Sequence, residues 1–173
     1  MLSIETDIAV IQQRTQQNED ENWDFRAFLK GCEIADIDHA VHRLYQQIAS
    51  QIECTTCANC CEVLHVSITQ DDIAKLAQHL GSSPQQFIDQ YACKDDEEEE
   101  GWAFRQQPCP FLHDNMCLHY AHRPELCQSY PHLQNDGIAW RLMSVIGNCE
   151  ICPIVFNVYE HLKYAMGYKT QVA

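Results

Sequence analysis

Apolar residues recur at helical spacing in several parts of the chain. Between positions 37 and 48 they return every three or four residues, which predicts an amphipathic helix with Asp36 or Asp38 as its N-cap. We expect an earlier helix over residues 4–16, a polar turn over 18–24, and a short helix over 23–29 that ends at Gly31. Pro153 opens a last helix, because the apolar residues that follow it share one face.

The middle of the chain mixes short strands and helices. Residues 63–68 alternate and are rich in β-branched side chains, which predicts a strand. Thr69 is expected to cap a helix that ends at Gly81, and Ser83 to cap a second helix that begins at Pro84. Further strands are expected at 102–104 and 137–142, whereas residues 105–135 carry several prolines and show no regular period.

These elements predict a small single domain of the α+β class, mostly helical, with short strands around an irregular cysteine-rich core. Residues 1–53 are expected to form a helical arm that packs on the core. Residues 54–150 are expected to form the cysteine-cluster metal-binding domain, and residues 151–173 the C-terminal helix.

The charge balance narrows the range of partners. The chain has 25 acidic and 11 basic residues, a formal net charge of -14. This balance argues against nucleic acid and against an anionic membrane surface as partners, and it identifies no protein partner.

The first residues have neither the basic nor the apolar region of a secretory signal, so we expect a cytoplasmic protein. In that reducing compartment eleven cysteines indicate metal or redox chemistry rather than a disulfide scaffold. The acidic run 95–100 is expected to be a solvated loop.

Four cysteines lie within eight residues: Cys54, Cys57, Cys60 and Cys61. A Cys-x2-Cys turn directs two sulfurs and neighbouring backbone N–H groups toward one ion, and here that spacing occurs twice in succession. Thiolates at this density repel one another unless a cation neutralises them. The run therefore predicts a soft metal centre, either zinc or an iron–sulfur cluster. Because Cys60 and Cys61 are adjacent, we expect their side chains to diverge.

A second group of cysteines lies in the irregular segment and beyond it, at Cys109, Cys117, Cys127 and Cys149. A loop this long inside a compact domain needs something to hold it, and these thiols are the candidates. The eight cysteines could fill two four-ligand sites, or fill one site and leave four as supporting residues. Without metal, residues 54–61 and 105–131 should be poorly ordered, because the energy of metal binding is there folding energy. The histidines near the cysteines could contribute to a mixed zinc site, but their proximity in sequence is weak support.

The two cysteine groups and the residues around them resemble the YkgJ-type CxxCxxCC proteins, which are described as a zinc- or iron-chelating domain and often labelled iron–sulfur-cluster proteins. The resemblance rests on the run 54–61, the segment 66–73 and a second block that includes Tyr120, Arg123-Pro124 and Tyr130-Pro131. It covers roughly residues 54–150, and its recurrent cysteines match the eight named above. Arg123 is expected beside the cofactor, where it would hydrogen-bond to a thiolate or a carbonyl oxygen.

The resemblance implies metal binding more firmly than it implies a reaction. The first hypothesis is a metal-binding protein with a structural, redox or regulatory role. The second is a cluster-dependent enzyme, an oxidoreductase or a methyl-transfer relative, because the flagellin lysine methylases carry a similar cysteine domain. The third is a metal sensor or metal chaperone. No catalytic residue can be named, since serine, histidine and aspartate never occur in a diagnostic context.

Overall fold

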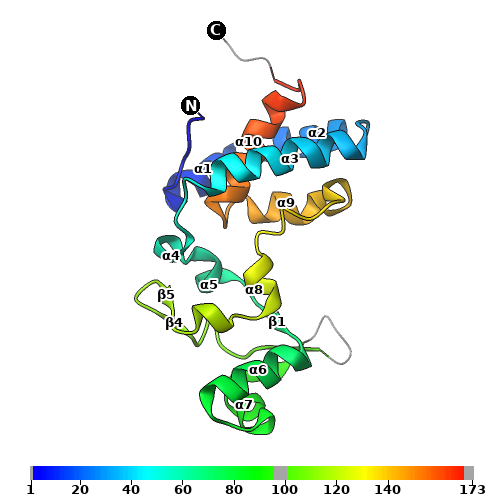
Figure 1. Cartoon of the computed structure of the whole chain (residues 1–173). Helices are drawn as coiled ribbons and strands as arrows, with labels where there is room; N and C mark the ends of the chain where they lie inside the picture. Colours follow the sequence, from blue (N-terminus) through cyan, green and yellow to red (C-terminus); the bar gives the residue numbers. More distant parts are fainter. Residues whose placement is uncertain (1, 96–100, 170–173) are drawn as a thin grey trace. The chain divides into compact units, whose positions relative to one another are not determined.

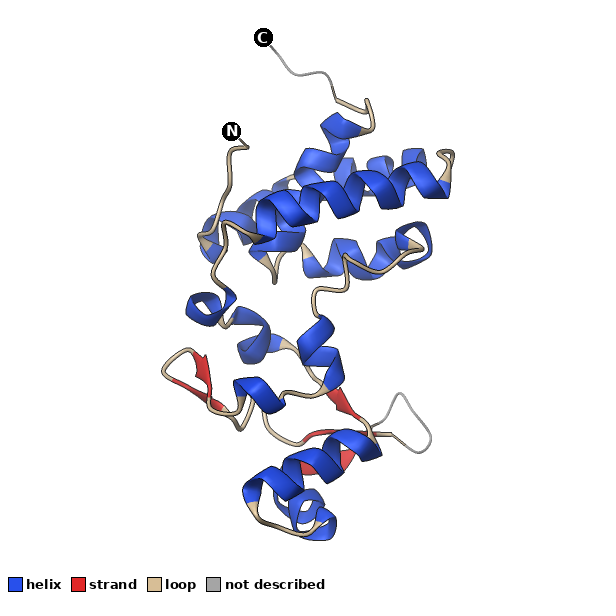
Figure 2. Ribbon diagram, in the orientation of Figure 1, coloured by secondary structure: helices blue, strands red, loops and turns tan. Residues whose placement is uncertain are grey.

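The computed structural model describes residues 2–95 and 101–169. These residues form two compact units, each described separately below: unit 1 comprises Met1–Glu53 and Pro131–Ala173, and unit 2 comprises Cys54–Tyr130. Helices predominate and the strands are few and short, as Figure 2 shows, which confirms the predicted α+β class. The three-segment division made from the sequence stays a prediction.

Unit 1 is helical (Figure 1). Its elements are α1 (Ile8–Gln17), α2 (Glu19–Leu29), α3 (Ile34–Ala49), the 3-10 turn η2 (Ile138–Arg141), α9 (Leu142–Asn148) and α10 (Pro153–Ala165). Helices α3 and α10 form the most extensive packing contact in this unit. The predicted apolar positions on α3 are buried, and α10 is buried around most of its circumference. Each fully buried aliphatic or aromatic side chain contributes about 1.5–3 kcal/mol, so this helix pair stabilises the unit.

Two secondary-structure elements predicted in unit 1 are wrong. Residues 18–24 are not a turn, because α2 begins at Glu19 and carries three acids in its first turn. Acidic side chains there interact favourably with the helix dipole, so the composition that suggested a loop instead supports a helix start. Residues 137–142 are not a strand, because Gly137 adopts a left-handed φ of 79° and leads directly into η2 and α9.

Asp38 has a different role from the predicted cap. The residue that precedes α3 is Glu33, and Asp38 lies one turn inside the helix. Its carboxylate accepts hydrogen bonds from the backbone N–H groups of Gly137, at 2.8 Å, and Ile138, at 2.9 Å. The first N–H groups of a helical turn have no acceptor within that turn. The Asp38 carboxylate is their acceptor here, from a helix about 100 residues earlier in the sequence.

We expect Asp38→Ala to lower the free energy of unfolding by about 2–3 kcal/mol, because it leaves the buried N–H of Ile138 and the partly buried N–H of Gly137 without this acceptor. Asp38→Asn should cost less, since the amide oxygen still accepts one of the two bonds. Urea unfolding monitored by circular dichroism measures both variants. Equal stability of Asp38→Ala and the wild type would contradict the assignment.

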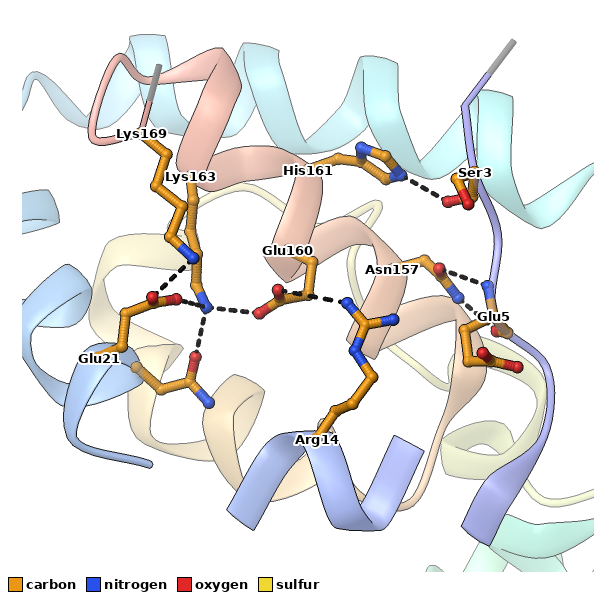
Figure 3. Close-up of polar contacts among 10 residues, drawn as sticks. Ser3, Glu5, Arg14, Glu21, Asn157, Glu160, His161, Lys163 and Lys169 are labelled. Carbon is orange, nitrogen blue, oxygen red and sulfur yellow. Dashed lines mark hydrogen bonds and ion pairs between the residues drawn. The ribbon is translucent and has the colours of Figure 1, made fainter. Parts of the chain in front are cut away.

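A buried lysine joins α2 to α10. The Lys163 side chain has no exposed surface, and its Nζ donates to Glu21 Oε1 at 2.6 Å, to Asn22 Oδ1 at 2.7 Å and to Glu160 (Figure 3). Lys169 Nζ contacts the second carboxylate oxygen of Glu21 at 2.6 Å. Partial burial disfavours the charged form of Glu21, but the hydrogen bonds from both lysines outweigh it and lower its pKa.

Unit 2 combines short helices with two small sheets (Figure 1). Its helices are α4 (Cys54–Cys57), α5 (Asn59–Val63), α6 (Gln70–Leu80), α7 (Pro84–Tyr91), the 3-10 turn η1 (Tyr120–His122) and α8 (Glu125–Ser129). One antiparallel sheet has the order β1-β3-β2, from β1 (Ser67–Ile68), β2 (Ala92–Lys94) and β3 (Trp102–Phe104). The other is the hairpin of β4 (Leu112–His113) and β5 (Met116–Cys117).

The helix starts of unit 2 follow the sequence signals. Thr69 and Ser83 both form capping boxes, and Gly81 ends α6 with a left-handed φ of 69°, as expected. The strand predicted over 63–68 is too long: α5 continues to Val63, and only Ser67 and Ile68 are in the strand β1. The core of the unit comprises Ile68, Ile73, Leu76, Ala77, Phe87, Ala92, Phe104 and Phe111, with Cys109 and Cys117 packed against it.

The acidic run begins inside this structure. Asp95 is buried, and its carboxylate accepts a hydrogen bond from the Ser67 hydroxyl, so this first acid is not part of a solvated loop. The rest of the run, 96–100, lies outside the described residues. Across the described ranges, no helix has both the length and the apolar character that a membrane span requires.

Candidate metal centre

The first cysteine run folds into two short helical segments. Helix α4 carries Cys54 and Cys57, and α5 carries Cys60 and Cys61. Between them Ala58 is buried and adopts a left-handed φ of 51°. A non-glycine residue in this conformation costs roughly 1–2 kcal/mol. The surrounding structure therefore enforces the bend that separates the two cysteine pairs.

The adjacent thiols do not diverge as expected. The Cys60 thiol donates a hydrogen bond to the sulfur of Cys61. Adjacent helical positions are only about 100° apart around the axis, so two side chains that lean toward each other can meet. This hydrogen bond and the positive charge of Arg123 lower the pKa of Cys61 to about 7, although burial acts in the opposite direction.

Cys109 lies beside Cys61. The Cys109 N–H donates to the carbonyl oxygen of Cys61 at 2.9 Å, which ties the irregular segment to the first cysteine run. The backbone N–H groups of Phe111 and Leu112 face the Cys109 sulfur and act to lower its pKa, and the Leu112 N–H also donates to the Cys109 carbonyl oxygen at 3.0 Å. Such N–H groups offset the negative charge of a thiolate, and they are the kind of support that thiolate metal ligands receive.

A tight hairpin positions Cys117. Asp114 and Asn115 both have positive φ angles, of 47° and 60°, which matches the two-residue turn that best fits the twist of paired strands. The hairpin pairs Leu112 with Cys117, and the backbone N–H of His119 donates to the Cys117 sulfur. Backbone N–H groups therefore face the sulfurs of two of the predicted ligands.

Asp72 positions the helix that carries Cys127. One oxygen of Asp72 completes the capping box with Thr69, and the other accepts from the Glu125 N–H at 3.1 Å. That bond holds the first turn of α8, which contains Cys127. The sequence gives no local signal for this bond, because it joins residues 53 positions apart.

Four thiols lie within electrostatic reach of one another. Cys127 is influenced by Cys109, Cys61 and Cys117, and both Cys109 and Cys117 are influenced by Cys61. Burial raises the pKa of Cys109 to about 11 and that of Cys127 to about 12, and it also raises the pKa of Cys117. A cation must therefore displace protons from these thiols when it binds.

Arg123 lies within electrostatic reach of three of these thiols. Its charge lowers the pKa values of Cys61, Cys117 and Cys127 against the opposing effect of burial on each. Its Nε donates to the Tyr120 carbonyl oxygen at 3.0 Å, and its guanidinium lies 3.6 Å from the centre of the Tyr120 ring. The ring and the carbonyl fix the orientation of the guanidinium.

The four cysteine side chains do not converge on a single point in this structure. Within residues 2–95 and 101–169, no three histidine, cysteine, aspartate or glutamate side chains are arranged to hold a metal ion. The donor set nevertheless fits zinc or an iron–sulfur cluster, because both take thiolates.

Cys149 belongs to unit 1. It is buried in α-helical packing, where its thiol donates to the Val145 carbonyl oxygen at 3.4 Å, and burial raises its pKa. Its assignment as a ligand stays a prediction from the sequence. The other predicted ligands, Cys54, Cys57 and Cys60, belong to unit 2 on α4 and α5, and α4 packs against the β5 strand that carries Cys117.

We expect Arg123→Gln to make the metal centre more sensitive to acid. Loss of the positive charge raises the pKa of the neighbouring thiols, so protons compete with the metal at a higher pH. The midpoint of acid-induced metal release should rise by a fraction of a pH unit, measured with a colorimetric metal indicator. Lys75→Gln removes the same charge from an exposed position on α6 and is the matched control. An unchanged midpoint for Arg123→Gln would contradict this role.

Comparison with known proteins agrees with the geometry. The sequence model of the CxxCxxCC family, described as a putative zinc- or iron-chelating domain, matches residues 53–152. No curated protein and no solved structure shows a significant match to the chain. The matched range is more than half of the 173 residues and includes all eight predicted ligands. The chain therefore belongs to the CxxCxxCC family of zinc- or iron-chelating domains.

Proposed function

We propose that the protein holds a zinc ion or an iron–sulfur cluster in unit 2, with Cys61, Cys109, Cys117 and Cys127 as the central ligands. Cys54, Cys57 and Cys60 are the further candidates that could complete a cluster or hold a second ion. The bound metal would replace the protons of the buried thiols and cross-link the segment 105–130 to the first cysteine run. The role is structural, redox or regulatory.

One observation carries this proposal: the thiols of four cysteines, Cys61, Cys109, Cys117 and Cys127, lie within electrostatic reach of one another, and the positive charge of Arg123 acts on all of them except Cys109. Buried thiols that pack only as small apolar side chains need neither a cation nor backbone N–H donors. The N–H groups directed at the sulfurs of Cys109 and Cys117 favour a form with negative charge on sulfur.

The first experiment is anaerobic purification, followed by measurement of iron, acid-labile sulfide and zinc per chain together with the visible spectrum. Iron with matching sulfide and broad visible absorption supports the cluster and a redox role. Zinc alone without colour supports a closed, structural or sensing site. Protein that contains neither metal after anaerobic purification, and that binds neither on reconstitution, would refute the proposal.

A metal sensor or metal chaperone is the second candidate, and the exposure of Cys54 favours it. An exchanging site needs a thiol that an incoming chelator can reach, whereas a structural site encloses its ligands. Transfer of zinc from the protein to a competing chelator within minutes would support exchange. Retention over hours at the same chelator concentration would exclude it and leave the structural or redox role.

A further inference from the structure

Three histidines gather at one end of α6, next to the segment that carries Cys117. His79 Nε2 lies 3.1 Å from His119 Nδ1, and the two rings meet edge to face with centroids 5.0 Å apart. The His122 ring stacks on His79 with centroids 3.8 Å apart and an angle of 26° between the planes. The three residues come from α6, from the residue before η1, and from η1 itself.

The spacing of the two nitrogens fits a shared metal ion. Imidazole nitrogens bind zinc at about 2.0–2.1 Å. Two such nitrogens 3.1 Å apart subtend roughly 100° at a common ion. That angle lies between the values of about 90° and about 109° for octahedral and tetrahedral coordination. In this hydrogen-bonded pair one of the two nitrogens carries a proton. Transfer of that proton to the other nitrogen of its ring, with small rotations of both rings, would direct two lone pairs toward one ion.

The surroundings favour a cation at this position. His79 lies in the last turn of the eleven-residue helix α6, where the helix dipole is negative and stabilises positive charge. The Phe111 ring packs edge to face on His119, with centroids 4.9 Å apart, and restricts its movement. His79 and His122 are exposed, so an ion can enter from solvent. The net charge of -14 also raises the local concentration of cations.

We propose that His79, His119 and His122 form a second, solvent-facing site for a divalent transition-metal ion. His79 and His119 supply the first two ligands, His122 reaches the ion by rotation of its side chain, and water completes the coordination. Imidazole ligands select ions such as Zn²⁺, Ni²⁺ and Cu²⁺ over Mg²⁺ and Ca²⁺. No cysteine is a ligand in this site. Its link to the cysteine centre is the backbone N–H of His119, which donates to the Cys117 sulfur, so the test measures the two centres separately.

The test uses the purified full chain with its cysteine centre loaded, and Ni²⁺ as the probe. Calorimetric titration at pH 7.5 should show one Ni²⁺ per chain, and His79→Gln should weaken its binding at least tenfold. His122→Gln is a second variant, with an expected loss of severalfold. His39→Gln changes an exposed histidine of unit 1 and should bind Ni²⁺ as the wild type does.

Nuclear magnetic resonance locates the ion and checks the fold. Paramagnetic broadening by Ni²⁺ should centre on the ring nitrogens of the three histidines, and the ¹H–¹⁵N spectra of the variants without Ni²⁺ should match the wild type. Broadening centred on other histidines or on the first cysteine run, residues 54–61, would overturn the proposal, as would wild-type affinity in His79→Gln. Metal content of the cysteine centre, measured before and after the titration, reports on the proposed function independently.

Discussion

Cys109→Ser should reduce the metal content of the purified protein to less than about a tenth of the wild-type value and should disorder much of segment 105–130. Cys109 joins the two cysteine groups, because its N–H bonds to the Cys61 carbonyl oxygen and its sulfur lies within electrostatic reach of Cys61 and Cys127. A structural zinc site contributes about 10–16 kcal/mol in zinc-finger peptides, which is comparable to the whole stability of a domain. Metal analysis and hydrogen exchange of residues 105–130 measure the two effects.

Cys93→Ser is the matched control for this experiment. Cys93 belongs to the same unit, but its thiol contacts the Ala103 carbonyl oxygen at 3.8 Å in the β2–β3 pair, and it is not among the predicted ligands. We expect this variant to keep its metal. Removal of metal from the wild type with a chelator should reproduce the hydrogen exchange of Cys109→Ser. A Cys109→Ser protein with full metal content would remove Cys109 from the ligand set.

Lys163→Met should lower the free energy of unfolding by about 3–5 kcal/mol, the range measured when one partner of a buried ion pair is removed. Methionine fills a similar volume, but Glu160, Glu21 and Asn22 lose a shared donor. Asn22 is itself buried, and its backbone carbonyl oxygen accepts a hydrogen bond from the Tyr159 hydroxyl at 2.9 Å. Movement of α2 away from α10 would break this bond as well. Urea unfolding followed by circular dichroism gives the free energy.

Lys169→Met is the control for Lys163→Met, because it removes the partly exposed lysine from the same carboxylate of Glu21. Partly exposed ion pairs contribute about 0–1 kcal/mol, since water and salt screen them. The two lysines should therefore differ by more than 2 kcal/mol in their effect on unfolding. Similar losses for both variants would show that burial of Lys163 does not determine the strength of the network.

The sequence predicted helix ends correctly where they depend on neighbouring residues. Thr69, Ser83, Gly81 and Pro153 mark helix ends, because capping hydrogen bonds and backbone conformations depend on residues within one turn. Residues 137–142 were misassigned to a strand, because a short apolar segment fits both helix and strand periods. In the structure this segment is helical, and the Asp38 carboxylate stabilises its first turn by accepting hydrogen bonds from the N–H groups of Gly137 and Ile138.

For the candidate site, the sequence alone determined the chemistry: the density of cysteines calls for a soft cation, whatever the fold, because thiolates so close together repel one another. Tertiary structure decided which thiols meet. It brought Cys61, Cys109, Cys117 and Cys127 within electrostatic reach of one another in unit 2, whereas Cys149 belongs to unit 1. It also brought His79 to His119 across 40 residues. Such contacts depend on how the chain closes its loops and buries its apolar faces, and they cannot be predicted from the spacing of residues in the sequence.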